Sequence, residues 1–259
     1  MTERQPLIIT PIKGLPLIQP GDNLAEIIGT GLVENEIRLL DGDIVVVAQK
    51  IVSKAEGRLV NLAEVSPSPE AIQLAQETGK DPRFVELLLQ ESNVVLRNRP
   101  GLIIVEHKHG YVCANAGIDH SNVEGDGGNR EDWVLLLPED ADNSASLLQK
   151  SLSEAFQANI GVLITDSHGR AWRLGTVGVS IGTAGVPELI NRIGDYDMFG
   201  YQLKATIIAA ADQLAAAATL VMGEVEERIP VVHVRGFPYP LRESSISEVI
   251  RPKEKDFFR

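Results

Sequence analysis

The sequence predicts an α+β fold with mixed or antiparallel sheets and packed helices, and three observations lead to this prediction. Short β-branched runs bounded by Gly, Asp or Pro recur along the chain, as is typical of strands. Amphipathic or alanine-rich stretches between some of these runs indicate helices. Leu102–Glu106 and Tyr111–Ala114 are joined by only four residues, His107-Lys108-His109-Gly110, which indicates a hairpin. Helices therefore do not separate every pair of strands, which favours α+β over a doubly wound sheet.

The predicted strands are spread over most of the chain. They are Ile44–Ala48, Leu102–Glu106, Tyr111–Ala114, Gly161–Thr165, Thr176–Ile181, Lys204–Ile208 and Val231–Val234.

The predicted helices have recognisable starts or faces. Ser68 followed by Pro69 is typical of a helix start, and Gly79 of its end. Asp81-Pro82 repeats the start signal before Phe84–Glu91. From Asp142 to about Asn159, apolar residues fall on one helical face, namely Leu147, Leu148, Leu152 and Phe156. Ala209–Met222 is rich in Ala and Leu, which are strong helix formers.

Composition restricts the classes of function. The 259 residues suffice for one large domain or two small ones, and the 44% hydrophobic content is typical of a globular protein. The 24 basic and 36 acidic residues give a net charge of −12, which disfavours nucleic acid as a partner. An anionic small molecule stays compatible with that charge, because local basic residues can still line a site.

The single cysteine, Cys113, excludes an internal disulfide and a cysteine-based zinc cluster. It lies in an apolar run, so we expect it to be buried. The sequence contains neither a signal-peptide pattern at its start nor about 18 consecutive apolar residues, so we expect no membrane association. Together these features predict a cytoplasmic protein.

Three separate segments place an acidic residue among small or turn-forming neighbours. Asp119 and Asp166 each follow an apolar run, and Glu224 follows a helix-like one. Oxygen ligands from separate segments suit Mg²⁺ or Mn²⁺ beside a phosphate. Each residue taken singly also fits an ordinary turn, where Asp, Asn, Ser and Gly are the common residues.

Basic residues accompany these segments. Lys50 and Lys54 follow a predicted buried strand, whereas Arg170 and Arg173 follow Asp166. Such cations fit phosphate or carboxylate binding, and they equally fit a solvated surface.

Other sequence features point away from standard cofactor motifs. The chain has neither a Walker phosphate loop nor a His-Glu-x-x-His zinc motif. Glycines at 175, 178, 182 and 185 favour close packing over cofactor binding. His107 and His109 are expected to be solvated in their hairpin. The polar segment Glu124–Asp132 fits a mobile flap and a plain surface loop equally well.

Five segments, taken in order, resemble the CofE family of coenzyme F420-0:L-glutamate ligases, which also forms the N-terminal half of the actinobacterial FbiB protein. They are Gly14–Ile18, Ile51–Arg58, Asn115–Asn122, Ile164–Arg170 and Met222–Glu224. The resemblance implies a CofE-like fold and one catalytic unit over residues 1–259, built from two interleaved subdomains and assembled as an intertwined homodimer. It also implies a GTP-dependent ligase that adds L-glutamate to F420-0, with two Mn²⁺ or Mg²⁺ ions and K⁺.

The resemblance also assigns residues. It implies that Asp119 and Asp166 bind one metal ion and that Ser167 and Glu224 bind a second. The implied GTP contacts are Leu15, Pro16, Leu17, Ile18, Gln49, Lys50, Lys54, Asn122, Met222, Gly223, Glu224, Val225, Glu226, Glu227, Arg228 and Ile229.

The residue chemistry adds a catalytic role for Lys54 and Arg170, which would neutralise charge during phosphoryl transfer. Two alternatives stay open at this point. The same chemistry can act on another carboxylate acceptor, because function depends on the site rather than the fold. The chain can also be a nucleotide-binding protein without catalysis.

Overall fold

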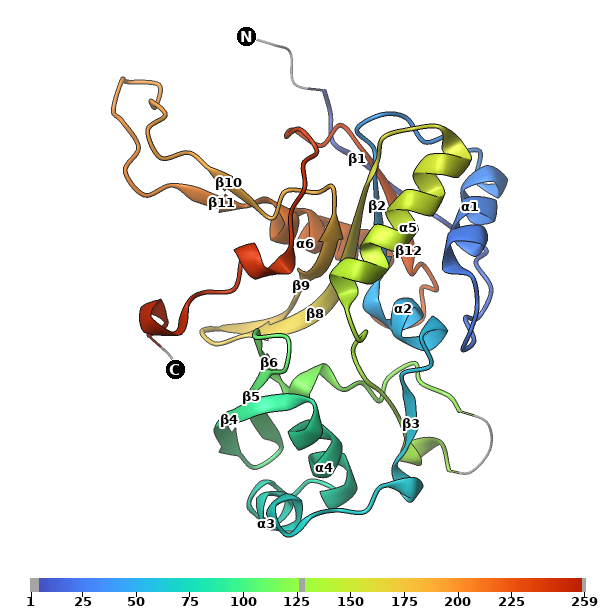
Figure 1. Ribbon diagram of the computed structural model, residues 1–259, viewed down its shortest axis with the longest axis vertical. Coiled ribbons are helices and arrows are strands. Elements are labelled where there is room, and N and C mark those ends of the chain that lie inside the picture. Colours follow the sequence, from blue (N-terminus) through green and yellow to red (C-terminus); the bar gives the residue numbers. More distant parts are fainter. Residues whose placement is uncertain (1–4, 126–128, 258–259) are drawn as a thin grey trace.

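The computed structural model describes residues 5–125 and 129–257 and confirms an α+β fold (Figure 1). Its main sheet has the strand order β1-β12-β2-β8-β9. Strands β2 and β8 are parallel, and every other neighbouring pair in this sheet is antiparallel. The strands are β1 (Ile8–Pro11), β12 (Val231–Arg235), β2 (Ile44–Ala48), β8 (Gly161–Arg170) and β9 (Arg173–Ala184).

Helices cover both faces of this sheet. Helices α1 (Leu24–Glu34), α2 (Gln49–Ala55) and α5 (Ala141–Phe156) contribute to the core on one face, and α6 (Ala210–Met222) packs on the other (Figure 1). Strand β2 is apolar throughout because its residues point alternately into the cores on the two faces of the sheet.

A second lobe has its own core and lies below the main sheet in Figure 1. It contains α3 (Pro69–Thr78), α4 (Pro82–Gln90) and the antiparallel strands β4 (Ser92–Arg99), β5 (Leu102–His107) and β6 (Val112–Ala114). The predicted caps are confirmed: the Ser68 side chain accepts from the Ala71 amide, and Gly79 ends α3 with φ 68°. Cys113 is buried here, as expected.

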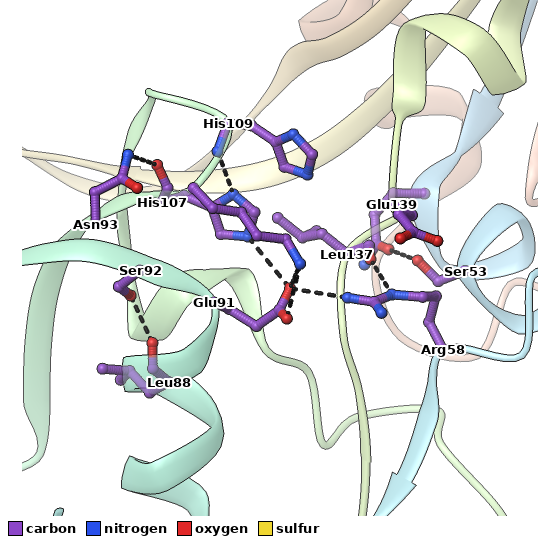
Figure 2. Close-up of polar contacts among 12 residues, drawn as sticks. Ser53, Arg58, Leu88, Glu91, Ser92, Asn93, His107, His109, Leu137 and Glu139 are labelled. Atoms are coloured by element: carbon purple, nitrogen blue, oxygen red, sulfur yellow. Dashed lines mark hydrogen bonds and ion pairs between the residues drawn. The ribbon is translucent and has the colours of Figure 1, made fainter.

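A two-stranded ribbon, β3 (Leu59–Asn61) with β7 (Trp133–Leu135), leads from the main sheet to this lobe. Polar contacts around Glu91 join the same regions (Figure 2). Arg58 donates to Glu91 at 2.8 Å and to the Leu137 carbonyl at 3.0 Å, and Lys108 also pairs with Glu91. A buried carboxylate with two cationic partners fixes the connection between the lobes.

The expected solvation of His107 is wrong. Its side chain is fully buried, and its ring stacks on the rings of both His109 and Tyr111, which also stack on each other. His107 Nδ1 accepts the backbone N–H of His109, and burial lowers the pKa of His107 to about 3. The imidazole is therefore neutral and forms part of the lobe core.

The glycine series is explained by helices packed on β9, which confirms close packing. A Cβ at Gly178 would lie 2.6 Å from the Ala215 carbonyl oxygen and from the Thr219 side chain. A Cβ at Gly182 would lie 2.5 Å from Ala141. Only glycine allows α6 and α5 to approach the strand this closely.

Some predicted boundaries differ from the structure. The strand predicted as Gly161–Thr165 continues to Arg170, so Asp166 lies within a strand and not after it. Lys50 and Lys54 follow β2 as expected, and they lie in helix α2, which was not predicted. The strand predicted at Lys204–Ile208 is only β11 (Ile207–Ala209), which pairs with β10 (Leu189–Asn191).

The sequence patterns also missed elements, namely β1, α1, α2, β3, β4, β7 and β10. Two glycines inside α1 obscured its helical pattern. Short 3-10 turns complete the described fold at Leu62–Glu64, Asn115–Gly117, Arg130–Asp132, Ile246–Glu248 and Lys253–Lys255. Within the predicted loop Glu124–Asp132, residues 126–128 lie outside the described part.

Glu188 is a fully buried carboxyl group that connects β9 to the start of α6. It contacts the Ser180 hydroxyl, and its backbone carbonyl accepts from the Ala210 amide at 2.9 Å. Burial raises the pKa of Glu188 to about 8; Ser180 opposes this shift, and the negative charges of Asp212, Asp142 and Glu248 add to it. Arg242 pairs with Glu248 on the same side.

This pKa predicts how stability depends on pH. The pKa of Glu188 is higher in the folded protein than in the unfolded chain. The stabilisation that protonated Glu188 gives to the folded state is therefore fully present below about pH 4.5 and is lost as pH rises through about 8. Replacing Glu188 with glutamine should therefore raise the Tm at pH 8.5 by roughly 5 °C or more, and by much less at pH 5. Thermal unfolding of both proteins at the two pH values measures this. An equal Tm difference at both pH values would contradict a neutral Glu188.

Candidate functional site

Asp119 follows a tight left-handed turn. Asn115, Ala116 and Gly117 all have positive φ, and a Cβ at Gly117 would lie 2.5 Å from the Leu137 side chain. Backbone bonds in both directions, each 2.9 Å, then join Asp119 to Leu135. The turn and this bridge fix the position of the Asp119 side chain.

The Asp119 carboxylate is held by the first turn of α2. Gln49 Nε2 donates to Asp119 Oδ2 at 2.7 Å, and Lys50 Nζ lies 3.2 Å from the same oxygen. Gln49 is itself buried and accepts from the Ser53 hydroxyl at 2.9 Å. The role of Ser53 could not be predicted from the sequence, because it depends on this contact with Gln49.

A second carboxylate lies close to Asp119. Burial raises the pKa of Asp119 to about 6; Lys50 opposes the shift, and the negative charge of Asp166 adds to it. Asp166 projects from β8 with His168 Nε2 at 3.1 Å. Its partner across the antiparallel pair is Val179, which packs on the core shared by α1, α2 and α5. Asp119 and Asp166 are therefore brought together on this face of the sheet.

Ser167 and Glu224 form a separate pair. Ser167 is opposite Gly178, which faces α6, so the Ser167 side chain lies on the other face of β8 from Asp166. Its hydroxyl donates to Glu224 at 3.0 Å, and so does the hydroxyl of Thr176. Thr176 was missed by the sequence patterns, because cross-strand pairing places it here. In residues 5–125 and 129–257, no group of three or more His, Cys, Asp or Glu side chains is arranged as a metal cluster.

Two lysines and Asn122 connect α2 to the turn after α6. Lys50 Nζ donates to the Ser121 hydroxyl at 2.8 Å, and Lys54 Nζ donates to the Asn122 carbonyl at 2.8 Å. The Asn122 amide donates in turn to the Val225 carbonyl at 3.0 Å. The Lys54 ammonium is partly removed from solvent. This burial, together with the neighbouring charge of Lys50, lowers the pKa of Lys54.

The other residues assigned to GTP by resemblance have different surroundings. Ile18 lies in the core beside α2, Leu15 packs on α1 at Gly31, and Leu17 is exposed. The Met222 side chain is buried in the core under α6. The remaining residues of the turn, from Glu224 to Arg228, are exposed.

Arg170 occupies a different place from Lys54. It lies on the hairpin between β8 and β9, where its guanidinium donates to the Leu174 carbonyl at 2.9 Å. Arg173 is exposed on the same hairpin. The described contacts therefore bring Lys50, Lys54 and the acidic pair together but leave Arg170 outside this group.

Comparison with known proteins gives a consistent result. Residues 13–236 match the family described as F420-0:Gamma-glutamyl ligase. The coenzyme F420:L-glutamate ligase of Methanothermobacter thermautotrophicus is 46% identical over 250 residues, which cover 96% of this chain and 97% of that protein. The ligases of Methanopyrus kandleri and Archaeoglobus fulgidus are 44% and 43% identical, with 96% and 97% of this chain covered and 97% and 96% of those proteins. The chain belongs to the F420-0:gamma-glutamyl ligase family.

Proposed function

We propose that this protein is a GTP- and divalent-metal-dependent ligase that joins L-glutamate to F420-0 through an amide bond. The observation that carries the proposal is the half-buried pair Asp119 and Asp166, flanked by Lys50 and Lys54. Relatives that match nearly the whole chain are named as coenzyme F420:L-glutamate ligases, which supports the same substrates for this protein. No helix in the described part of the chain has the length and apolar character of a membrane span.

The acidic pair has the chemistry of a hard-cation site. The negative charge of Asp166 helps to raise the pKa of Asp119, and a bound cation would offset this repulsion; Mg²⁺ and Mn²⁺ prefer oxygen ligands. Asp119 and Asp166 would hold one ion. Ser167 and Glu224 supply a hydroxyl and a carboxylate, which suit a second ion. When bound, such ions supply charge neutralisation to the phosphate oxygens.

The reaction needs an activated carboxylate, because hydroxide is a poor leaving group. A carboxylate oxygen of F420-0 attacks the γ-phosphorus of GTP, and the bond to GDP breaks to leave an acyl phosphate. The glutamate amine then attacks the acyl carbon, the bond to phosphate breaks, and the amine loses a proton. GDP and phosphate are released.

The protein's own residues would position and neutralise these groups. Each lysine ammonium has three donors, and Lys54 directs one of them to the Asn122 carbonyl. The others are available to phosphate oxygens, where a preorganised, partly desolvated cation acts strongly. Arg170 lies farther along the hairpin between β8 and β9, and we assign it to neutralising charge during phosphoryl transfer.

The decisive assay combines the protein with GTP, Mn²⁺, L-glutamate and F420-0, and measures product mass and GDP release. A gain of one or more glutamyl residues, with matching GDP, is expected. GTP turnover without added mass would favour another carboxylate acceptor. GTP binding in calorimetry without phosphate release for any acceptor would favour a non-catalytic protein. Parallel reactions with ATP and with K⁺ or Na⁺ test the nucleotide and the monovalent ion.

A protruding hairpin supports the proposed homodimer. The segment between β10 and β11 projects from the body (Figure 1), and Asp197 Oδ1 fixes its tip by accepting from the Phe199 and Tyr201 amides at 2.8 and 2.9 Å. Met198 and Phe199 are each 87% exposed at this tip. An ordered arm with exposed large apolar side chains is typical of a contact surface.

The arm gives a direct test of assembly. Aspartate at both Met198 and Phe199 should convert the dimer to a monomer, because a buried apolar contact cannot accommodate two new charges. Light scattering after gel filtration measures the mass, and aspartate at the exposed Leu147 of α5 is the matched control. A monomeric wild-type protein would rule out the homodimer.

A further inference from the structure

The residue after Asp119 lines a pocket that the acidic pair does not use. This open pocket has a volume of about 530 Å³ and is lined by Leu62, Asp81, His120, Arg130 and Glu131. This volume falls within the range of about 300–1,000 Å³ that is common for small-molecule sites. His120 lines the pocket and directly follows Asp119, the proposed metal ligand, so their Cα atoms are only about 3.8 Å apart.

The wall of this pocket carries an aromatic platform. The His120 ring stacks on Phe84 with 5.3 Å between centroids and 19° between planes. Phe84 is buried in the core of the second lobe, whereas His120 is exposed. Lys80 Nζ lies 5.2 Å from the centroid of the Phe84 ring, which adds a cation–π contact behind the stack. An exposed ring backed by a buried one is a surface on which another planar ring can stack.

The charges around the platform suit a ligand with an anionic tail. Asp81 is paired with Arg83 at 2.6 Å, Arg83 also pairs with Asp132 at 3.1 Å, and Lys80 at the Phe84 ring adds a second positive charge beside these two carboxylates. Arg130 is exposed on the pocket wall and offers a forked donor to a phosphate or carboxylate. Glu131 is also exposed there and can accept from ligand hydroxyls.

We propose that this pocket binds the acceptor of the ligation, with its planar heteroaromatic ring on His120 and its phosphate-bearing tail beside Arg130. This inference rests on the proposed function and extends it to the substrate site. Because His120 directly follows Asp119 in the chain, an acceptor held on His120 would lie near the proposed metal site, where its carboxylate has to meet the γ-phosphate. The pocket thus separates acceptor recognition from the lysines assigned to GTP.

The test compares three variants with the wild-type protein. Acceptor affinity is measured without GTP by quenching of deazaflavin fluorescence, and KM is measured separately for F420-0 and GTP. His120→Ala and Arg130→Ala should each weaken acceptor binding about tenfold and raise the KM for F420-0, because the first removes the stacking surface and the second removes a donor to the anionic tail. His120→Phe should restore acceptor affinity, because it retains a planar ring. The KM for GTP should stay within twofold throughout.

Lys150→Ala is the matched control, since Lys150 is an exposed cation on α5. Unchanged acceptor affinity in His120→Ala and Arg130→Ala, in a protein that ligates glutamate, would overturn the acceptor site alone. An equal loss of GTP affinity would also overturn it, because the pocket would then serve the whole site. A wild-type protein that neither binds nor extends F420-0 would overturn the proposed function together with this inference.

Discussion

Replacing Asp166 with asparagine should lower the rate of glutamate ligation by at least about 100-fold. Loss of a group that only supports a metal ligand commonly costs 10–100-fold, so loss of a ligand should cost more. Asparagine keeps the shape of the side chain within β8 and removes its negative charge. The pairing of β8 with β9 should therefore survive, and the loss should be confined to the site.

Two measurements separate this effect from unfolding. Mn²⁺ binding by calorimetry should weaken in the Asp166 variant, while its Tm should stay near that of the wild-type protein. Asp119→Asn should show a similar loss, and the double variant should be little worse, because residues that act as a unit are not additive. Glu70→Gln, at an exposed position on α3, is the control. Wild-type turnover and Mn²⁺ affinity in the Asp166 variant would exclude it as a ligand.

Replacing Asp43 with alanine should cost about 3–5 kcal/mol of stability, because it leaves buried polar partners uncompensated. Asp43 is 2% exposed and lies at the start of β2. Arg235 donates to it through two nitrogens at 2.9 and 2.6 Å, and His233 lies at 2.9 Å. The Leu40 amide donates at 2.9 Å. Burial raises the pKa of Asp43, but the hydrogen bonds from Arg235 and His233 outweigh this effect. The pKa of Asp43 is therefore lowered overall.

The expected fall in Tm is about 10 °C. Because the folded pKa is lowered, the stabilisation by Asp43 is present above its unfolded value near 3.8 and disappears as pH falls through the folded value. Thermal unfolding at pH 7 measures the main effect. The exposed Glu34, in the last turn of α1, gives the control Glu34→Ala. A Tm of the Asp43→Ala variant within 2 °C of the wild-type value would show that the pairing of β12 with β2 does not depend on the Asp43–Arg235 ion pair.

Much of the fold could be predicted because the relevant signals are local. The start of α3 depends on a serine and a proline within two residues, and both act through nearby backbone groups. The apolar run of β2 reflects burial on both faces, which a continuous β-branched segment indicates. Helix α1 was missed because internal glycines are read locally as breaks, whereas its burial against the main sheet stabilises it.

The candidate site was predictable only as an ordered set of segments. Nothing in the sequence shows that Gln49 supports Asp119, or that Thr176 joins Ser167 at Glu224. These contacts join residues separated by 48 to 70 positions and depend on strand register and helix placement. The same is true of the stacking between Phe84 and His120, which creates the proposed acceptor platform.

The sequence by itself determined the α+β class, most strands and helices, the residue types for metal and phosphate, and the resemblance to a ligase family. The tertiary structure alone decided which of these residues meet. Asp166 and Ser167 are neighbours in the chain, yet the two-residue period of β8 sends them to opposite faces. Asp119 reaches Asp166 because parallel pairing of β2 with β8 brings α2 and its carboxylate partner to that face. Local propensities act within a few residues, whereas burial and charge pairing act between segments that only folding brings together.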